Sequence, residues 1–124
     1  MSGGTVSYNN ANTSGGAICI GDAGNGKVNI TGGTLSYNTA KYGGAINLDG
    51  GTAVISSGTI SYNKASYQGG AIRVTGSGAV TLGDSGCKGN NASHNCPVVK
   101  KNTYVNPSDG VNPNSLVGAA IAMS

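Results

Sequence analysis

The chain has 124 residues, which is enough for one domain built around one core. It contains 23 Gly and 6 Tyr but neither Phe nor Trp, and only 9% of its residues are charged, which is unusual for a compact two-layer domain. The net charge of +3 comes from scattered basic residues, so no nucleic-acid-binding face is expected, and no apolar segment approaches the ~20 residues that span a bilayer.

A repeat begins near the first residue. Residues 4–11 read Gly-Thr-Val-Ser-Tyr-Asn-Asn-Ala, residues 15–18 read Gly-Gly-Ala-Ile, and an apolar patch follows at 28–30. The same three segments recur in order at 33–40, 43–46 and 53–55, and again at 58–65, 69–72 and 80–82. Internal repeats of this length are typical of solenoid proteins.

A degenerate fourth unit continues the series. Residues 87–92 align with 60–65, residues 118–123 align with 69–74, and residues 93–117 then form an inserted loop. We therefore expect one domain over 1–124, with coils at approximately 4–31, 32–56, 57–82 and 83–124.

The repeat unit predicts three short strands separated by Gly-rich turns. Helices are not expected, because no window shows a 3.6-residue apolar period and Gly and β-branched residues are frequent throughout. Three strands in ~25 residues fit one coil of a stack whose neighbours lie ~4.8 Å apart. The predicted fold is all-β, a right-handed parallel β-helix of about four coils.

Stacking predicts which side chains meet in the interior. Every position in the expected columns is apolar, and alternation along each strand places the residues between the second and third columns outside, namely Cys19, Asn47, Arg73 and Ala122. The four inward columns are Val6, Leu35, Ile60 and Cys87; Ile18, Ile46, Ile72 and Ile121; Ile20, Leu48, Val74 and Met123; and Ile30, Ile55 and Leu82.

An amide follows the first strand of each unit. Stacked Asn side chains can hydrogen-bond along the stack and tolerate the left-handed backbone that such a turn needs. The glycine pairs at 15–16, 43–44 and 69–70 are expected to adopt positive φ. The Ala at positions 11, 40, 65 and 92 is expected to fit a tight corner. The expected amide column is Asn9, Asn38, Asn63 and Asn90.

The Gly-Gly-Ala-Ile segments, together with the aliphatic-x-x-Asn segments at 6–9, 35–38 and 60–63 and Cys87-x-x-Asn90, resemble the repeats of chlamydial polymorphic membrane proteins and related bacterial surface β-helices. That family has Phe at the first position of the second motif, where this chain has an aliphatic residue or Cys. The resemblance covers residues 4–92 and implies an exported adhesin or a surface-display role.

Few residues of the chain suit catalysis or ligand binding. Polysaccharide-degrading enzymes need clustered carboxylates, but the chain has four Asp and no Glu, and Asp22 and Asp49 are better interpreted as turn formers than as a catalytic pair. Thr and Ser at positions such as 5 and 7 recur in the next two repeats and should form columns of hydroxyl groups on the outer surface. Such columns resemble those of ice-binding solenoids, so ice binding is a minor alternative. Tyr42 and Tyr67 could stack on sugars or pack over a glycine turn. No catalytic residue and no cofactor are expected.

The cysteines leave two interpretations open. A disulfide between Cys87 and Cys96 would suit an exported protein, and two unpaired thiols are the alternative, with Cys19 left over. Cys87, His94 and Cys96 would supply only three metal ligands, so no metal site is expected.

The functional hypothesis follows from the two ends of the predicted stack, where unpaired strand groups lie over an apolar interior. We expect a non-enzymatic structural or adhesive module whose partners are other copies of the chain, joined end to end in a filament, or further coils of a longer surface adhesin that binds a glycan or a host surface. Residues 1–4 do not read as a signal peptide, so the chain is either cytosolic or a mature or excised part of an exported protein. The second option is preferred, which predicts an extracellular or cell-surface location.

Overall fold

The computed structural model describes residues 1–83, 87, 96–104 and 121–123, and within these residues every regular element is a β-strand. Every pairing between them is parallel. The all-β, parallel character expected from the repeat is therefore confirmed. The strands are β1 Thr5–Ser7, β2 Ile18–Ser36, β3 Thr39–Tyr42, β4 Ile46–Ser61, β5 Lys64–Gln68, β6 Ile72–Thr75, β7 Ala79–Leu82, β8 Val98–Lys100, β9 Thr103–Tyr104 and β10 Ile121–Met123.

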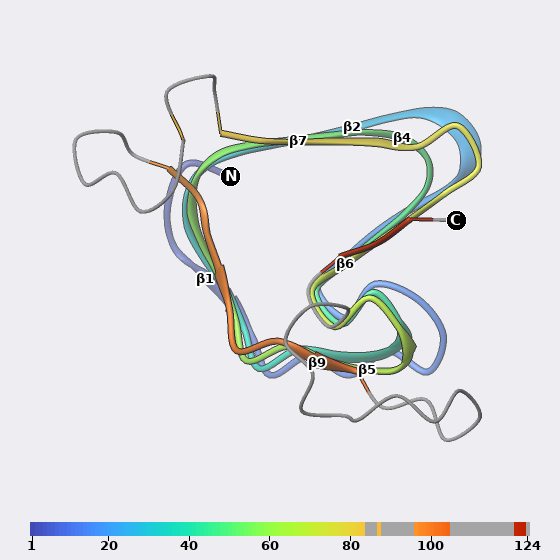
Figure 1. The fold of residues 1–124 in the computed structure, drawn as a ribbon, viewed down its shortest axis with the longest axis horizontal. Helices are drawn as coiled ribbons and strands as arrows, with labels where there is room; N and C mark the ends of the chain where they lie inside the picture. Colours follow the sequence, from blue (N-terminus) through green and yellow to red (C-terminus); the bar gives the residue numbers. More distant parts are fainter. Residues whose placement is uncertain (84–86, 88–95, 105–120, 124) are drawn as a thin grey trace.

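The strands form two sheets, and the larger one is strongly curled. Its order is β1-β2-β4-β6-β10, with β7 and β8 also paired to β4, and the smaller sheet has the order β3-β5-β9. Figure 1 shows the chain following the same outline repeatedly, so that segments from successive repeats lie over one another. The larger sheet bends around most of this outline, and the smaller sheet closes the side marked by β5 and β9.

The strands are longer than the three short strands expected in each repeat. β2 has 19 residues and β4 has 16, and each continues around corners at which turns were expected. The glycines at these corners still bend the backbone, because Gly33, Gly51 and Gly58 all have positive φ. Pairing persists through the bends with local register shifts, so the corners are bulges within continuous strands rather than breaks between them.

Strand register aligns the repeats as the sequence comparison predicts for the first three units. Ile18 pairs with Ile46, Ile46 with Ile72 and Ile72 with Ile121, and the neighbouring column runs from Ile20 through Leu48 and Val74 to Met123. Val6, Leu35 and Ile60 form another column, and Ile30, Ile55 and Leu82 form the fourth. The middle members of these columns are fully buried and make up the core.

The fourth repeat starts later than the sequence alignment places it. Val98–Lys100 pairs with Thr59–Ser61, so Val99, and not Cys87, lies beside Ile60. Asn102 accordingly occupies the position expected for Asn90, a residue that lies outside the described part of the chain. The expectation that residues 93–117 form one inserted loop is also wrong, because β8 and β9 lie within this range and belong to the two sheets. The signal that could have found this register is the aliphatic-x-x-Asn motif of residues 99–102.

The glycine pairs have two different roles. The first glycine of each pair, Gly15, Gly43 or Gly69, has positive φ as expected. The second is required by the stacking distance, because a Cβ on Gly16 would lie 2.1 Å from the carbonyl oxygen of Gly44, and a Cβ on Gly44 would lie 2.2 Å from that of Gly70. No side chain fits between backbones that approach this closely.

Replacing Ile46 with Ala should lower the free energy of unfolding by roughly 2–5 kcal/mol, because it opens a cavity between Ile18 and Ile72 in a fully buried column. Val54→Ala is the matched control on the same strand, since Val54 is 38% exposed and its truncation should cost less than about 1 kcal/mol. Urea denaturation of both variants checks this. Equal losses would contradict the assigned core.

Candidate functional site

A column of buried amides runs through the first corner of each repeat. The Oδ1 atom of Asn38 accepts hydrogen bonds from the backbone N–H of Asn9 at 3.1 Å and from its Nδ2 at 2.9 Å. Asn63 receives the same pair from Asn38 at 3.0 and 2.9 Å, and Asn102 receives it from Asn63 at 2.9 Å each. Asn9, Asn38 and Asn63 thus form a hydrogen-bonded column, as expected. Asn102 is its fourth member.

The column has a direction, so its two ends differ chemically. Each amide oxygen accepts from the preceding repeat, and each Nδ2 reaches back to a carbonyl of that repeat, as from Asn102 to Ile60 at 2.9 Å. At one end, Asn9 acts only as a donor among the described residues, so its Oδ1 is left without a donor. At the other end, the backbone N–H of Asn102 has no acceptor among the described residues.

A column of tyrosines precedes the amides. Tyr8, Tyr37 and Tyr62 all have left-handed backbone, with φ of 58°, 56° and 56°. Their rings stack with centroids 5.0 Å apart and with interplanar angles of 2° and 5°. The sequence favours the following Asn for the left-handed position. This was wrong by one residue, because the Asn side chain bonds into the stack and the bend falls on the Tyr before it.

Lys101 takes the tyrosine position in the fourth repeat. It shares the left-handed backbone, with φ of 54°, and its Nζ lies 5.2 Å from the centroid of the Tyr62 ring. Nζ also donates a hydrogen bond to the Tyr62 hydroxyl at 2.9 Å. This hydrogen bond, reinforced by the Lys101 charge, lowers the pKa of the Tyr62 phenol and raises the pKa of Lys101. The aromatic column therefore has a cation at one end and the ring of Tyr8, which is 77% exposed, at the other.

The apolar interior is incompletely covered in the first and last repeats. The apolar column members Ile30, Leu35, Ile46, Leu48, Ile55, Ile60, Ile72 and Val74 are at most 3% exposed. Other column members, among them Val6, Ile18, Ile20, Leu82 and Ile121, pack against this core but are only partly buried. Among the described residues, partly buried apolar side chains thus lie on both sides of the core, Val6, Ile18, Ile20 and Val28 on one side and Val80, Leu82, Val99 and Ile121 on the other.

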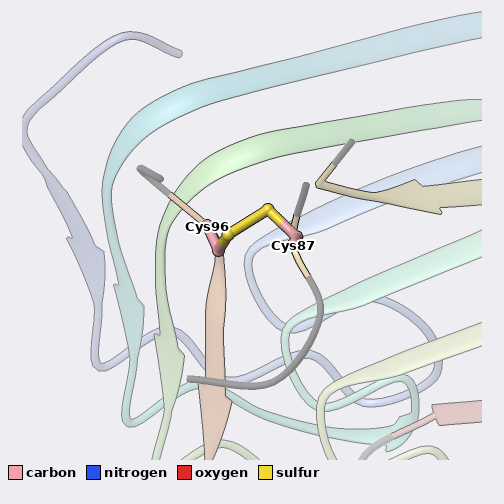
Figure 2. The surroundings of a disulfide bond; sticks show 2 residues. All are labelled: Cys87 and Cys96. Atoms are coloured by element: carbon pink, nitrogen blue, oxygen red, sulfur yellow. A yellow bond between two sulfur atoms is a disulfide. The ribbon is translucent and has the colours of Figure 1, made fainter. Parts of the chain in front are cut away.

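A disulfide joins Cys87 to Cys96, which was one of the two alternatives left open by the sequence. Figure 2 shows that the bond connects the segment after β7 to the residues that lead into β8. It therefore ties the start of the fourth repeat to the end of the third. Cys19 is a free, exposed thiol on β2.

The other candidate residues do not form a reactive centre in the described part of the chain. Asp49 lies within β4 rather than in a turn, and its Oδ1 accepts a hydrogen bond from the Thr75 hydroxyl at 2.8 Å. Ser36 and Ser61 are 7% and 5% exposed, so they do not form the open hydroxyl rank that ice binding would require. His94 lies outside the described residues. Among the residues searched, no three His, Cys, Asp or Glu side chains gather as a metal site, and no helix is long and apolar enough to cross a membrane.

Comparison of the chain with protein-family models, with curated proteins and with solved structures found no match.

Replacing Asn63 with Ala should lower the free energy of unfolding by roughly 3 kcal/mol, because it leaves the N–H and Nδ2 of Asn38 without their buried acceptor. Asn9→Ala is the control at the exposed end of the same column and should cost about 1 kcal/mol or less. Chemical denaturation followed by circular dichroism measures both. Equal costs at the two positions would contradict a role for burial in this column.

Replacing Cys87 and Cys96 together with Ser should lower the free energy of unfolding by about 2–3 kcal/mol, because the disulfide closes a short loop of nine-residue separation. The measurement is the thermal midpoint of the double variant beside that of the parent chain with and without reductant. Reductant should lower the midpoint of the parent chain and leave that of the variant unchanged. Cys19→Ser is the control and should behave like the parent chain.

Proposed function

We propose that the chain is a right-handed parallel β-helix of about four stacked coils that serves as a non-enzymatic structural module and associates end to end with copies of itself. The parallel pairing of equivalent residues in successive repeats supports the coiled architecture. In such a stack, one coil cannot bury its own apolar face, so each outer coil needs a neighbour.

The main support for this proposal is that the two ends of the amide column are complementary, with an acceptor at Asn9 and a donor at Asn102. Inside the chain, the N–H of each column Asn donates to the Oδ1 of the next one, as from Asn63 to Asn102. If a second copy continues the stack beyond Asn102, the N–H of Asn102, which has no acceptor among the described residues, meets the Oδ1 of the second copy's Asn9, which has no donor among them. The Asn9 Nδ2 of that copy then reaches the carbonyl of Val99, as the Nδ2 of Asn102 reaches that of Ile60. Both contacts repeat a geometry that is present three times within the chain.

The aromatic column favours the same contact. The ammonium group of Lys101 covers one ring, that of Tyr62. Continued stacking brings the exposed Tyr8 ring of a second copy to the other side of this cation. A cation between two aromatic rings is a favourable arrangement. The contact joins unlike surfaces, so it leaves a free end after every addition and propagates as a filament.

Location and lack of catalysis are parts of the same proposal. The disulfide between Cys87 and Cys96 supports an oxidising, extracellular or cell-surface environment. The absence of Glu and the hydrogen-bonded state of Asp49 support a non-enzymatic role. The main alternative is that the same faces are covered by further coils of a longer adhesin, because the donors and acceptors at the faces fit any coil of this repeat.

Replacing Tyr8 with Lys should abolish end-to-end association, because it places an ammonium group against Lys101 of the adjacent copy. Adding Lys101→Glu to this variant should restore association by reversing one of the two charges. Sedimentation velocity across a range of protein concentrations, with electron microscopy of the largest species, measures the result.

The matched control is Tyr67→Lys, which introduces the same charge at a side chain that is 39% exposed and lies away from both faces of the stack. It should assemble as the parent chain does. A parent chain that stays monomeric at the highest soluble concentration would contradict self-association. Equal loss of assembly in the Tyr8 and Tyr67 variants would contradict the proposed contact.

A further inference from the structure

A second cluster of aromatic and basic side chains lies on the flank of the stack, away from both faces. It is built from the ends of β3 and β5 and the outward side of β4 and β6, segments that stacking brings together from different repeats. Its members are Lys41, Tyr42, Asn47, Tyr67, Gln68 and Arg73, which we call the flank cluster.

Arg73, the single arginine of the chain, is held in a fixed orientation. Its guanidinium lies over the ring of Tyr42, with Cζ 4.5 Å from the ring centroid. Nε donates to Oε1 of Gln68 at 3.0 Å, and Nη1 donates to Oδ1 of Asn47 at 3.2 Å. Alternation correctly placed Asn47 away from the interior columns, yet it is only 2% exposed, so this anchor for Arg73 is rigid. The flat ring and two amide oxygens fix the plane of the guanidinium before any ligand arrives.

The partners that orient Arg73 are neutral, so they leave its charge uncompensated. A guanidinium has five N–H groups, and the two hydrogen bonds to Gln68 and Asn47 leave the rest of the fork available. Lys41 adds a second cation, with Nζ 5.2 Å from the centroid of Tyr42 and 5.7 Å from that of Tyr67. Two cations thus share contact with one tyrosine ring. An Arg fork of this kind matches the paired oxygens of a carboxylate or a sulfate.

Tyr67 indicates what the anion is attached to. Its ring meets that of Tyr42 edge to face, with centroids 5.3 Å apart, and it is 39% exposed. An exposed aromatic ring beside an anion-binding fork suits a sugar ring that carries an acidic group, because the C–H face of the sugar packs on the aromatic surface. A phosphate backbone would instead need a denser array of basic residues than these two.

We propose that the flank cluster is a binding site for acidic polysaccharides, in which Arg73 and Lys41 bind a carboxylate or sulfate group and Tyr67 contacts the sugar ring. The site lies within one chain, so it goes beyond the proposed end-to-end association and does not depend on it.

Isothermal titration calorimetry tests this site with three hexasaccharides: one of uronic acids, one that is heavily sulfated and one that is neutral. Binding of either acidic ligand, with none of the neutral one, is the expected result, and the two acidic ligands distinguish carboxylate from sulfate. Arg73→Gln should weaken that binding about tenfold or more, because it removes a charge-assisted pair of hydrogen bonds. Arg73→Lys should bind more tightly than Arg73→Gln but more weakly than the parent chain, because lysine restores the positive charge without the planar guanidinium.

Two further variants keep the test decisive. Lys41→Gln should weaken binding without affecting folding, because the Lys41 contacts are confined to ring faces at the surface. Lys27→Gln removes the same charge from an exposed position on β2 outside the cluster and should change affinity less than about twofold. Circular dichroism confirms that each variant is folded. The proposal is overturned if neither acidic hexasaccharide binds, or if Lys27→Gln weakens binding as much as Arg73→Gln. It is also overturned if the single-stranded DNA hexathymidylate, which tests for recognition of a phosphate backbone, binds more tightly than both acidic hexasaccharides.

Discussion

The buried amides Asn38, Asn63 and Asn102 must find their hydrogen-bond partners inside the stack, and this requirement fixes how the repeats align. Asn38 and Asn63 are fully buried, and an unpaired amide at such a position would cost about 1–3 kcal/mol for each unsatisfied group. Their donors and acceptors are satisfied only when successive repeats lie in register, with Asn over Asn. Apolar columns alone would tolerate a shift between similar aliphatic side chains. The amide column does not, so it sets the register that the core then fills.

The same alignment explains which parts of the molecule could be predicted from sequence. The columns through Ile46 and Asn38 follow from equivalent positions in three clear repeats, since a stack places such positions together. The start of the fourth repeat was missed because Cys87 and Asn90 imitate the aliphatic-x-x-Asn spacing, whereas Val99 and Asn102 carry the true register with Lys residues between them. Motif matching cannot choose between two such segments, because the choice depends on the length of chain needed to return to the stack.

The sequence pointed to Tyr42 and Tyr67 of the flank cluster, but the contact of Tyr42 with Arg73 could not be predicted from sequence comparison, for a different reason. Tyr42 and Arg73 belong to different repeats, and nothing in the spacing of 31 residues marks them as neighbours. They meet because the second repeat places β3 one level away from the third, and because Arg73 is long enough to reach back over the buried Asn47. Sequence periodicity predicts contacts between equivalent positions. Contacts between non-equivalent positions depend on side-chain length and direction, which the three-dimensional structure supplies.

The tyrosine column shows that stability alone does not explain the surface. A left-handed backbone costs a non-glycine residue roughly 1–2 kcal/mol, and each stacked pair of rings returns about 0.5–1.5 kcal/mol. Three residues are left-handed but only two pairs of rings stack, so stacking returns less than the bends cost, and Gly or Asn would occupy these bends at a lower conformational cost. Tyrosine is therefore better explained by what its ring presents at the surface.

The replacement of the fourth ring by Lys101 gives this surface a direction. An uninterrupted column of identical rings would have similar ends and would allow two copies to meet by either face. With an ammonium group at one end and an exposed ring at the other, contact between two Lys101 ends is repulsive, and contact between unlike ends is attractive. The amide column has the same polarity, because in the described part of the chain each Asn donates to the next one, from Asn9 to Asn102. Two independent columns therefore favour the same head-to-tail order of neighbouring coils.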